Sequence, residues 1–445
     1  MSFSIPVIAD GSTITVDSTE TQQKRGEPDS FGSNFSSLEL RSMLNEKVLQ
    51  GDWLVDLKVV SSPPRLIPKW QANVERQSQL VRFALSEEQF GRASVANTDK
   101  GYRLLMHERY QSTAGSTRIA AIWVEQDIQR TRFAGAVRFQ QSINKLQSVS
   151  PSVNVSVTAY KRKKLVFSRA FEQLAECEEC VGLSAAMPFP LGRVSQGVAG
   201  VLAARLEYKQ MSHSGVPFNL SLDWRTRDLM PLMPAHHTHR PIDLLSHTSC
   251  IRPQLIKRKA SLEQKRASAR SMLERQWNAP LISGCAPGHL QKSSATGFLY
   301  LSAFLESATG RSVEELVFEE LSAVYNIPSL SAERYGSENI LGLGLQSSAP
   351  DLALLLARVL NGNIMSARFR DRRFLNQGRG NGRYSFGWRM TSNRVAELSD
   401  DFDGYAARVV VDYRSGNILV MLLSGGVEPA SLNSLQAELL ALLAS

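Results

Sequence analysis

The stretch Phe189-Pro-Leu-Gly-Arg-Val-Ser-Gln-Gly-Val198 runs directly into Val198-Ala-Gly-Val-Leu-Ala-Ala-Arg-Leu206. The second part is apolar with a period of about 3.6 residues, which predicts a helix. Gly192 and Ser195 are residue types that readily build a helix start. We therefore expect Arg193 to stand at the N-terminus of an apolar helix.

Strand patterns occur on both sides of this helix in the sequence. Alternating or short apolar runs of β-forming residues lie between turn residues. The elements that we expect are a strand at Val153–Tyr160, a turn at Lys161–Lys164, a strand at Leu165–Phe171, and, at the end of the chain, a strand at Gly404–Asp412, a turn at Arg414–Asn417, a strand at Ile418–Leu423 and a helix at Pro429–Leu443. The chain from residue 153 onward therefore mixes strands and helices.

Two further stretches carry a resemblance to a known family. Leu244-Leu-Ser-His-Thr-Ser249 resembles the Leu-Leu-Thr-His-Thr-Ser-Gly of the serine β-lactamase and penicillin-binding-protein superfamily. Thr296-Gly-Phe298 through Ala308-Thr-Gly310 resembles the helix after its second motif. With the order of elements, residues 152–445 are most similar to the class C β-lactamase, esterase and D-aminopeptidase-like branch. The resemblance implies an α+β domain, in which helices flank an antiparallel sheet and a helical subdomain forms the other wall of a cleft.

The chain in front of residue 152 divides into a tail and a small domain. Residues 1–36 are rich in Ser, Thr, Asp, Gln and Gly, which bury little surface, so we expect a disordered tail. Residues 37–151 are expected to form a small α/β domain, with a helix, a strand, a turn and a strand between residues 83 and 125. Gly101-Tyr-Arg103, Tyr110 and Ala120-Ala-Ile-Trp123 resemble a bacterial tandem-repeat unit, to which we assign binding or support and no chemistry.

The resembled family acylates a serine with the help of three motifs. The first is Ser-x-x-Lys at a helix N-terminus, where the Lys takes the serine's proton. The second is Tyr-x-Asn, which relays protons and holds substrate. The third is a Lys or His, one residue, then Gly, on a strand edge. Alignment on residues 189–198 places Arg193 at the serine and Gln196 at the lysine, and neither a guanidinium nor an amide can do this chemistry.

The second and third motifs depart from the family pattern as well. Alignment on residues 287–297 places Ser293 at the tyrosine and Ala295 at the asparagine. The third motif would fall in Glu397–Asp403, which is acidic, and no Lys or His follows Lys292. We therefore predict a binding or regulatory pseudoenzyme that has lost the acyl-enzyme machinery.

The alternative is a divergent serine hydrolase of β-lactamase type, or an acyl transferase, acting on an ester or amide. Its fallback nucleophile is Ser195, which lies in Gly-x-x-Ser-x-Gly rather than in the Gly-x-Ser-x-Gly of a nucleophile elbow. His247 is expected to support the turn of its motif. A cation at a helix N-terminus favours a carboxylate or phosphate ligand, so Arg193, Ser195 and Ser293 are the candidate ligand-binding residues.

Composition and charge limit the partners. The net charge of +9 comes from residues 1–292, which carry 38 basic and 26 acidic side chains, whereas the rest has 13 Arg against 16 acids. The basic helical stretch from Arg252 to Arg275 is either a solvated face or a surface for a small acidic ligand or a protein partner. Zinc-finger, helix-turn-helix and RNA-binding patterns are absent from the sequence, so we do not expect a nucleic-acid partner.

Cysteine and histidine content bears on cofactor and compartment. Cys177-Glu-Glu-Cys180, with His236-His-Thr-His239, is a weak candidate for zinc or redox chemistry. The simpler hypothesis is exposed histidines and four free thiols, Cys250 and Cys285 included, in a reducing compartment. The sequence starts without a signal-peptide pattern and has no apolar run of about 18 residues, so we expect a soluble, cytoplasmic protein with no membrane span and no cofactor.

Overall fold

The computed structural model describes residues 4–9, 12–17, 40, 43–44, 47, 52–60, 65–72, 79–99, 102–112, 115–125, 133–150, 152–171, 187–213, 215–253, 280–332, 339–376, 382–392 and 394–445. Their contacts divide the chain into two compact units. One unit comprises residues 1–130 and 177–186, and the other comprises residues 131–176 and 187–445. Each unit has its own hydrophobic core.

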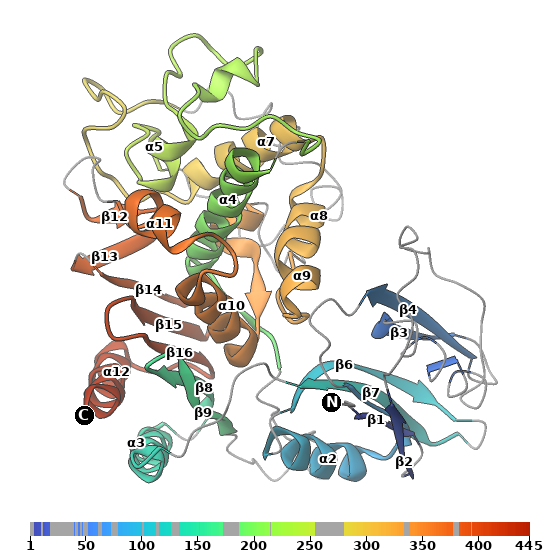
Figure 1. Ribbon diagram of the computed structural model, residues 1–445. Coiled ribbons are helices and arrows are strands. Elements are labelled where there is room, and N and C mark those ends of the chain that lie inside the picture. Colours follow the sequence, from blue (N-terminus) through green and yellow to red (C-terminus); the bar gives the residue numbers. More distant parts are fainter. Residues whose placement is uncertain are drawn as a thin grey trace. The chain divides into compact units, whose positions relative to one another are not determined.

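The first unit contains antiparallel strand pairs and a helix (Figure 1). β1 (Ser4–Ala9) pairs with β2 (Ser12–Asp17), β3 (Asp52–Val60) pairs with β4 (Arg65–Ala72), and β7 (Thr117–Glu125) lies between β5 (Gln79–Leu85) and β6 (Tyr102–Gln111). Ser86 and Gln89 exchange side-chain-to-backbone hydrogen bonds of 2.8 and 3.2 Å, and this capping box starts α2 (Glu87–Asp99). The elements expected between residues 83 and 125 are confirmed.

Two expectations about the front of the chain differ from the structure. β1 and β2 form a hairpin within residues 1–36, where we expected a tail, because β1 is rich in Ile and Val and β2 in Thr, Ile and Val, which favour strands. α3 (Ala136–Val149) belongs to the second unit, since Phe139, Ile143 and Leu146 pack into that unit's core. The division between the units therefore falls near residue 130, whereas the expected boundary is residue 151.

The second unit is built on a seven-stranded antiparallel sheet (Figure 1). Its strand order is β12 (Tyr384–Ser385), β13 (Trp388–Ser392), β14 (Val395–Phe402), β15 (Tyr405–Asp412), β16 (Asn417–Ser424), β8 (Asn154–Lys161) and β9 (Lys164–Phe171). β8 pairs with β16, so strands from the two ends of this unit meet inside one sheet. The four strands predicted from residues 153–171 and 404–423 are confirmed, and so is the α+β class.

Helices cover both faces of this sheet (Figure 1). α3 and α12 (Pro429–Ala444) pack on it through a buried apolar cluster that includes Phe167, Met421 and Leu439. α10 (Ala349–Asn361) contacts β8 and β16, while α4 (Val194–Ser212) contacts β13 and β14. α4 is buried along most of its length, as its apolar sequence predicts.

The remaining helical elements surround α4 and α10. They are η1 (Thr226–Asp228), α5 (Pro241–Leu245), α7 (Thr296–Thr309), α8 (Val313–Val317), η3 (Phe318–Ser322), α9 (Ala323–Tyr325), η4 (Ile340–Gly344), α11 (Ala367–Phe369) and η5 (Arg370–Phe374), with a short strand pair of β10 (Phe189–Pro190) and β11 (Gln346–Ser347). α7 is the helix expected from Thr296 to Gly310 and ends at that glycine, whose φ of 70° is left-handed. Among the described residues, no helix is long and apolar enough to cross a membrane.

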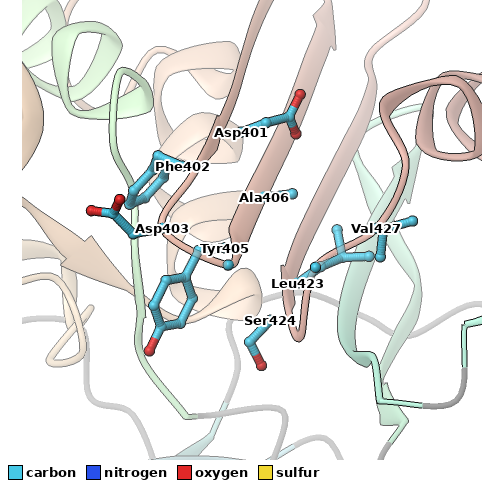
Figure 2. A pocket seen from close by; sticks show the side chains of 10 residues that line it. Asp401, Phe402, Asp403, Tyr405, Ala406, Leu423, Ser424 and Val427 are labelled. Carbon is cyan, nitrogen blue, oxygen red and sulfur yellow. The ribbon is translucent and has the colours of Figure 1, made fainter.

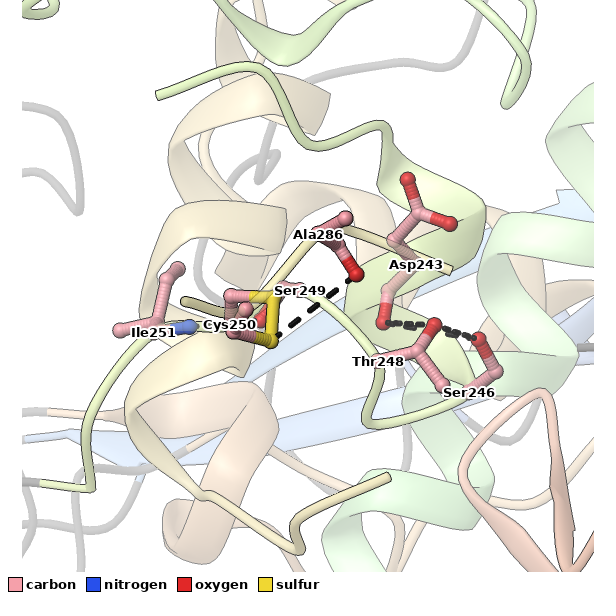
Figure 3. The surroundings of a disulfide bond; sticks show 8 residues. Asp243, Ser246, Thr248, Ser249, Cys250, Ile251 and Ala286 are labelled. Atoms are coloured by element: carbon pink, nitrogen blue, oxygen red, sulfur yellow. Dashed lines mark hydrogen bonds between the residues drawn. A yellow bond between two sulfur atoms is a disulfide. The ribbon is translucent and has the colours of Figure 1, made fainter. Parts of the chain in front are cut away.

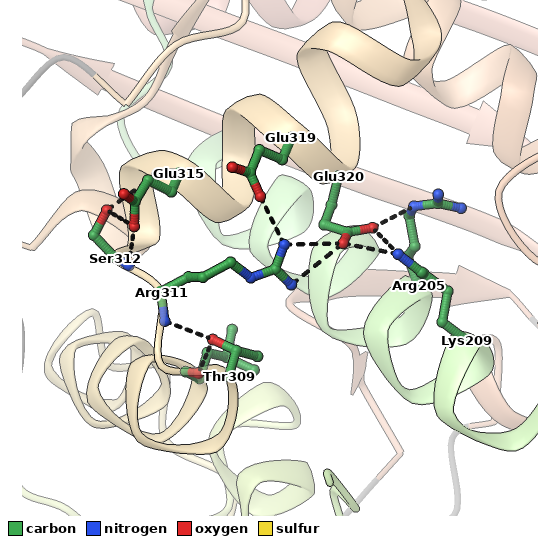
Figure 4. Close-up of polar contacts among 9 residues, drawn as sticks. Arg205, Lys209, Thr309, Arg311, Ser312, Glu315, Glu319 and Glu320 are labelled. Carbon is green, nitrogen blue, oxygen red and sulfur yellow. Dashed lines mark hydrogen bonds and ion pairs between the residues drawn. The ribbon is translucent and has the colours of Figure 1, made fainter. Parts of the chain in front are cut away.

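Glu320 of η3 is a buried carboxylate that joins three cations (Figure 4). It lies 3.2 Å from Arg205 and 2.9 Å from Lys209, both on α4, and 3.3 Å from Arg311. Burial alone would raise the pKa of Glu320, but the hydrogen bond from Lys209 and the three positive charges lower it. This cluster ties α4 to η3.

Replacing this carboxylate should leave the three cations without their shared partner. We expect Glu320→Gln to lower the free energy of unfolding by about 3 kcal/mol, measured by urea denaturation at pH 7. The matched control is Glu319→Gln, because Glu319 also pairs with Arg311 but is 50% exposed, and it should cost under about 1 kcal/mol. Equal losses in the two variants would contradict the role given to Glu320.

Candidate functional site at the start of helix α4

Arg193 lies at the N-cap of α4 and faces β14. Its backbone N–H donates to Asp400 Oδ2 at 2.9 Å, and its guanidinium Nε lies 3.8 Å from Asp400 Oδ1. The Arg193 side chain is 58% exposed, whereas that of Asp400 is 9% exposed. Among the described residues, the guanidinium has this ion pair and no hydrogen bond, so its donors remain available.

Gly192 allows this close approach of helix and strand. It has a φ of 51°, and a side chain there would collide with Asp400 and Phe402 of β14. On the other side of α4, Gly387 has a φ of 81°, and a side chain there would collide with the backbone of Gln196. The start of α4 is therefore fixed between two turns that need glycine.

Ser195 and Gln196 face the protein interior. Ser195 is fully buried, and its hydroxyl oxygen accepts a hydrogen bond of 3.1 Å from the backbone N–H of Leu345. Gln196 is 2% exposed, and its amide donates to the Gly342 carbonyl at 3.3 Å. Both side chains hold the η4 segment, and the Ser195 side chain has no exposure to solvent.

The first two motif positions meet through η4. Asn339 is fully buried; its amide donates to the Ala295 carbonyl, and its Oδ1 accepts from the Gly342 backbone at 2.9 Å. Gln196 bonds the carbonyl of the same glycine, so a polar chain links the lysine position to the asparagine position. Ser293, at the tyrosine position, is exposed. Asn339 was missed in the sequence, because it belongs to none of the motifs.

His247 lies in a left-handed turn, with a φ of 57°, and is 3% exposed. Its Nδ1 accepts the Ser294 backbone N–H at 3.2 Å, and its ring meets the Tyr384 ring edge-on at 4.7 Å between centroids. Burial lowers the pKa of His247 to about 4, and the positive charge of Arg193 acts in the same direction. The ring is therefore neutral near pH 7, with its proton on Nε2, for which no described residue is a hydrogen-bond partner.

β14, the strand expected to carry the third motif, places the carboxylate of Asp400 at the site. Asp400 pairs with Arg193, and the family's cation has no counterpart on β14. The sequence marked Glu397–Asp403 as acidic but could not show which acid meets Arg193, because the two residues are 207 positions apart. The polarity of the site is thus the reverse of the family's: a cation at the serine position and an anion on the strand.

A hollow of about 220 Å³ lies at the turn between β14 and β15 (Figure 2). Its lining combines the carboxylates of Asp401 and Asp403 with the rings of Phe402 and Tyr405, whose centroids are 6.1 Å apart. Arg408 donates to both carboxylate oxygens of Asp401 at 2.8 Å. The hollow is therefore lined by aromatic rings together with carboxylates, of which that of Asp401 is paired with Arg408.

The thiol prediction is wrong for two of the four cysteines. Cys250 and Cys285 form a disulfide (Figure 3). Their sequence separation gave no hint of the pairing, which depends on the folding of two distant loops. Cys177 and Cys180, the zinc or redox candidates, lie outside the described residues, as does most of the basic stretch from 252 to 275. The expectation of a cytoplasmic protein thereby loses the support of free thiols at Cys250 and Cys285.

The expectation of exposed histidines is also wrong for two residues. His237 and His239 are fully buried and stack around the Tyr300 ring, at 5.5 Å between centroids in each case, while His236 is exposed. Burial lowers the pKa of His239 to about 3. The described part of the chain contains no group of three or more His, Cys, Asp or Glu residues that could hold a metal ion.

Comparison with known proteins identifies the family and the fold of the second unit. The family model described as Beta-lactamase matches residues 147–444. FmtA from Staphylococcus aureus has a similar structure, with a TM-score of 0.58 and 13% identity over 71% of this chain and 90% of that chain. SurE with D-Leu gives a TM-score of 0.56 and 17% identity over 69% and 75% of the two chains.

A third similar structure is the Beta-lactamase/D-alanine Carboxypeptidase from Yersinia pestis complexed with citrate. It has a TM-score of 0.51 and 12% identity, over 68% of this chain and 99% of that chain. At these identities the likeness shows the fold. No curated protein matches the sequence.

The buried neutral His247 should make stability depend on pH. Between its unfolded pKa of 6.5 and its folded pKa of about 4, the unfolded chain binds the proton and the folded chain does not. Its contribution to the free energy of unfolding should therefore fall by roughly 3 kcal/mol from pH 7 to pH 4.

His247→Asn should remove this part of the pH dependence. Asn tolerates a left-handed φ and can accept the Ser294 N–H, but it does not titrate. The measurement is urea unfolding of both proteins at several pH values between 7 and 4. An equally steep fall in the variant would contradict the assignment of the proton uptake to His247.

Proposed function

This chain belongs to the beta-lactamase family, and we propose that it is a member that forms no acyl-enzyme and instead binds a small carboxylate ligand at Arg193. The observation that carries the proposal is the Arg193–Asp400 arrangement. A permanently charged, largely exposed guanidinium stands at the serine position, and a nearly buried carboxylate fixes its backbone.

Loss of the acyl-enzyme is supported by the residues around the first motif. Arg193 has no nucleophilic atom, and the Gln196 amide accepts no proton near neutral pH while it holds η4. Ser195 is buried with its oxygen already accepting a hydrogen bond. General acid–base groups typically contribute about 10²–10⁴-fold to rate, so a site without them should turn over little.

A carboxylate ligand is supported by the donors around Arg193. The guanidinium offers a planar set of N–H groups that matches a carboxylate in a bidentate way. The first backbone N–H groups of α4 are already bonded to the carbonyls of the preceding turn and to Asp400, so the side chain, rather than the helix end, is the binding group. Two of the similar structures were determined with D-Leu and with citrate, which both carry carboxylates.

The absence of acyl-enzyme chemistry can be tested with covalent probes. We expect no mass increase when the protein is incubated with a penicillin or a fluorophosphonate and its intact mass is measured. Arg193→Ser combined with Gln196→Lys should also stay unlabelled, because the second and third motifs are missing too. A stoichiometric adduct on the wild type that Ser195→Ala removes would overturn the proposal and make the protein a serine hydrolase.

Ligand binding can be tested with citrate, and with inorganic phosphate as a second anion. Arg193→Gln should weaken citrate binding about tenfold, which is the usual scale for a hydrogen bond to a charged group, in calorimetric titrations. Asp400→Asn should strengthen it, because a competing negative charge is removed.

The matched control is Arg389→Gln, on β13. Arg389 is 57% exposed and pairs with Glu397 at 3.3 Å, so its exposure and charge resemble those of Arg193. Equal losses in Arg389→Gln and Arg193→Gln would show diffuse charge attraction and refute a site at Arg193. Phosphate binding stronger than citrate binding would refute the choice of a carboxylate.

A further inference from the structure

A ladder of backbone hydrogen bonds joins the segment 247–252 to the segment 280–294, and the disulfide lies within it. The bonds run from Arg252 N to Pro280 O, from Ile282 N to Cys250 O, from Gly288 N to Thr248 O and from Lys292 N to His247 O, at 2.8 to 3.0 Å. Cys250 and Cys285 lie 5.7 Å apart between Cα atoms. The first segment carries His247, and the second carries Ser293 and continues into Ala295, so the disulfide connects two segments that carry motif positions of the candidate site.

The turn on the first segment is held in an unfavourable conformation. His247 and Cys250 both have a left-handed φ, 57° and 63°, which residues with a side chain rarely adopt. Thr248 stabilises the turn through its contacts with the Asp243 carbonyl and the Ser246 hydroxyl (Figure 3). Such conformations persist only where the surroundings hold them, and at Cys250 the covalent link is one of these restraints.

The two cysteines differ in their exposure to solvent. Cys250 is 3% exposed, whereas Cys285 is half-buried in a loop next to the exposed Ala286. A thiolate in solution would therefore attack the Cys285 sulfur, since exchange needs access to the attacked atom.

We infer that the Cys250–Cys285 disulfide is a redox-sensitive clamp on the candidate site, closed in an oxidising compartment and opened by a dithiol. One thiolate of the dithiol bonds to the Cys285 sulfur, and the disulfide breaks. Cys250 leaves as a thiolate and takes a proton. The second thiol of the reductant, as its thiolate, then displaces the Cys285 thiolate, which is protonated in turn, and the reductant ends as a cyclic disulfide. Two electrons pass to the protein, and both cysteines become thiols. This inference does not depend on the ligand proposed above.

Opening the clamp should loosen the two segments while the rest of the unit keeps its structure. The experiment uses the full chain, purified without reductant, before and after treatment with dithiothreitol. N-ethylmaleimide should label Cys250 and Cys285 only after reduction. Hydrogen–deuterium exchange in peptides that cover 247–252 and 280–294 should become about tenfold faster or more, while β8 and β16 stay unchanged.

Two double variants separate this clamp from the other cysteines. Cys250→Ser with Cys285→Ser should exchange fast in these peptides with or without dithiothreitol. Cys177→Ser with Cys180→Ser is the matched control and should respond to the reductant as the wild type does. If the first variant does not fold, the comparison of oxidised and reduced wild type still decides.

Three results would overturn the inference. The first is labelling of Cys250 and Cys285 without reduction, which would mean that the disulfide does not form. The second is unchanged exchange in the two segments after reduction, which would make the link a passive staple. The third is a response that disappears when Cys177 and Cys180 are replaced.

Discussion

The site depends on the contact between the first turn of α4 and strand β14. α4 has no acidic residue in its first turn and no capping hydrogen bond from the side chain of its N-cap residue. Asp400, on a strand distant in the sequence, takes the place of the missing acid and of the missing cap. Its carboxylate accepts the Arg193 N–H and places negative charge at the positive end of the helix. Gly192 makes this possible, since any larger residue would push the strand away. The hydrogen bond from the Arg193 N–H to Asp400 therefore fixes the backbone from which the Arg193 side chain extends.

Side chains at positions aligned with the family's motifs take part in the internal framework of the second unit. Gln196, Gly342, Asn339 and Ala295 form a continuous polar chain in which every buried amide has a partner. A satisfied buried network specifies one arrangement, because leaving any member unpaired costs free energy. The chain joins the residues aligned with the first and second motifs, and neither the Gln196 amide nor the Ala295 methyl group accepts a proton near neutral pH.

Local sequence patterns predicted the helices and strands, whereas contacts between residues far apart in the sequence form the candidate site. The apolar period after Val198, the hairpin near residue 160 and the closing helix are properties of short segments, and each was found where expected. The Arg193–Asp400 pair and the Cys250–Cys285 disulfide join residues far apart in the sequence, so only the folded chain shows them. The burial of His237 and His239 was missed for a similar reason. A His-rich segment reads as exposed in the sequence, and only the folded chain brings the Tyr300 ring against both imidazoles.

The electrostatics of the site favour binding a stable anion over stabilising a transition state. An acyl transfer site needs donors aimed at an oxyanion that appears only during reaction, together with a nucleophile that can lose its proton. Here Asp400 lies within hydrogen-bond distance of the backbone of residue 193, so any oxygen nucleophile at that position would lose its proton beside an existing negative charge. Coulomb repulsion would oppose that step. A guanidinium at residue 193 is instead stabilised by Asp400, and its exposed side chain suits the anionic ligand that we propose. Asp400 on β14 and Arg193 on α4 therefore act as one unit. Replacing Arg193 with serine alone would leave that serine beside the negative charge of Asp400, which opposes loss of its proton.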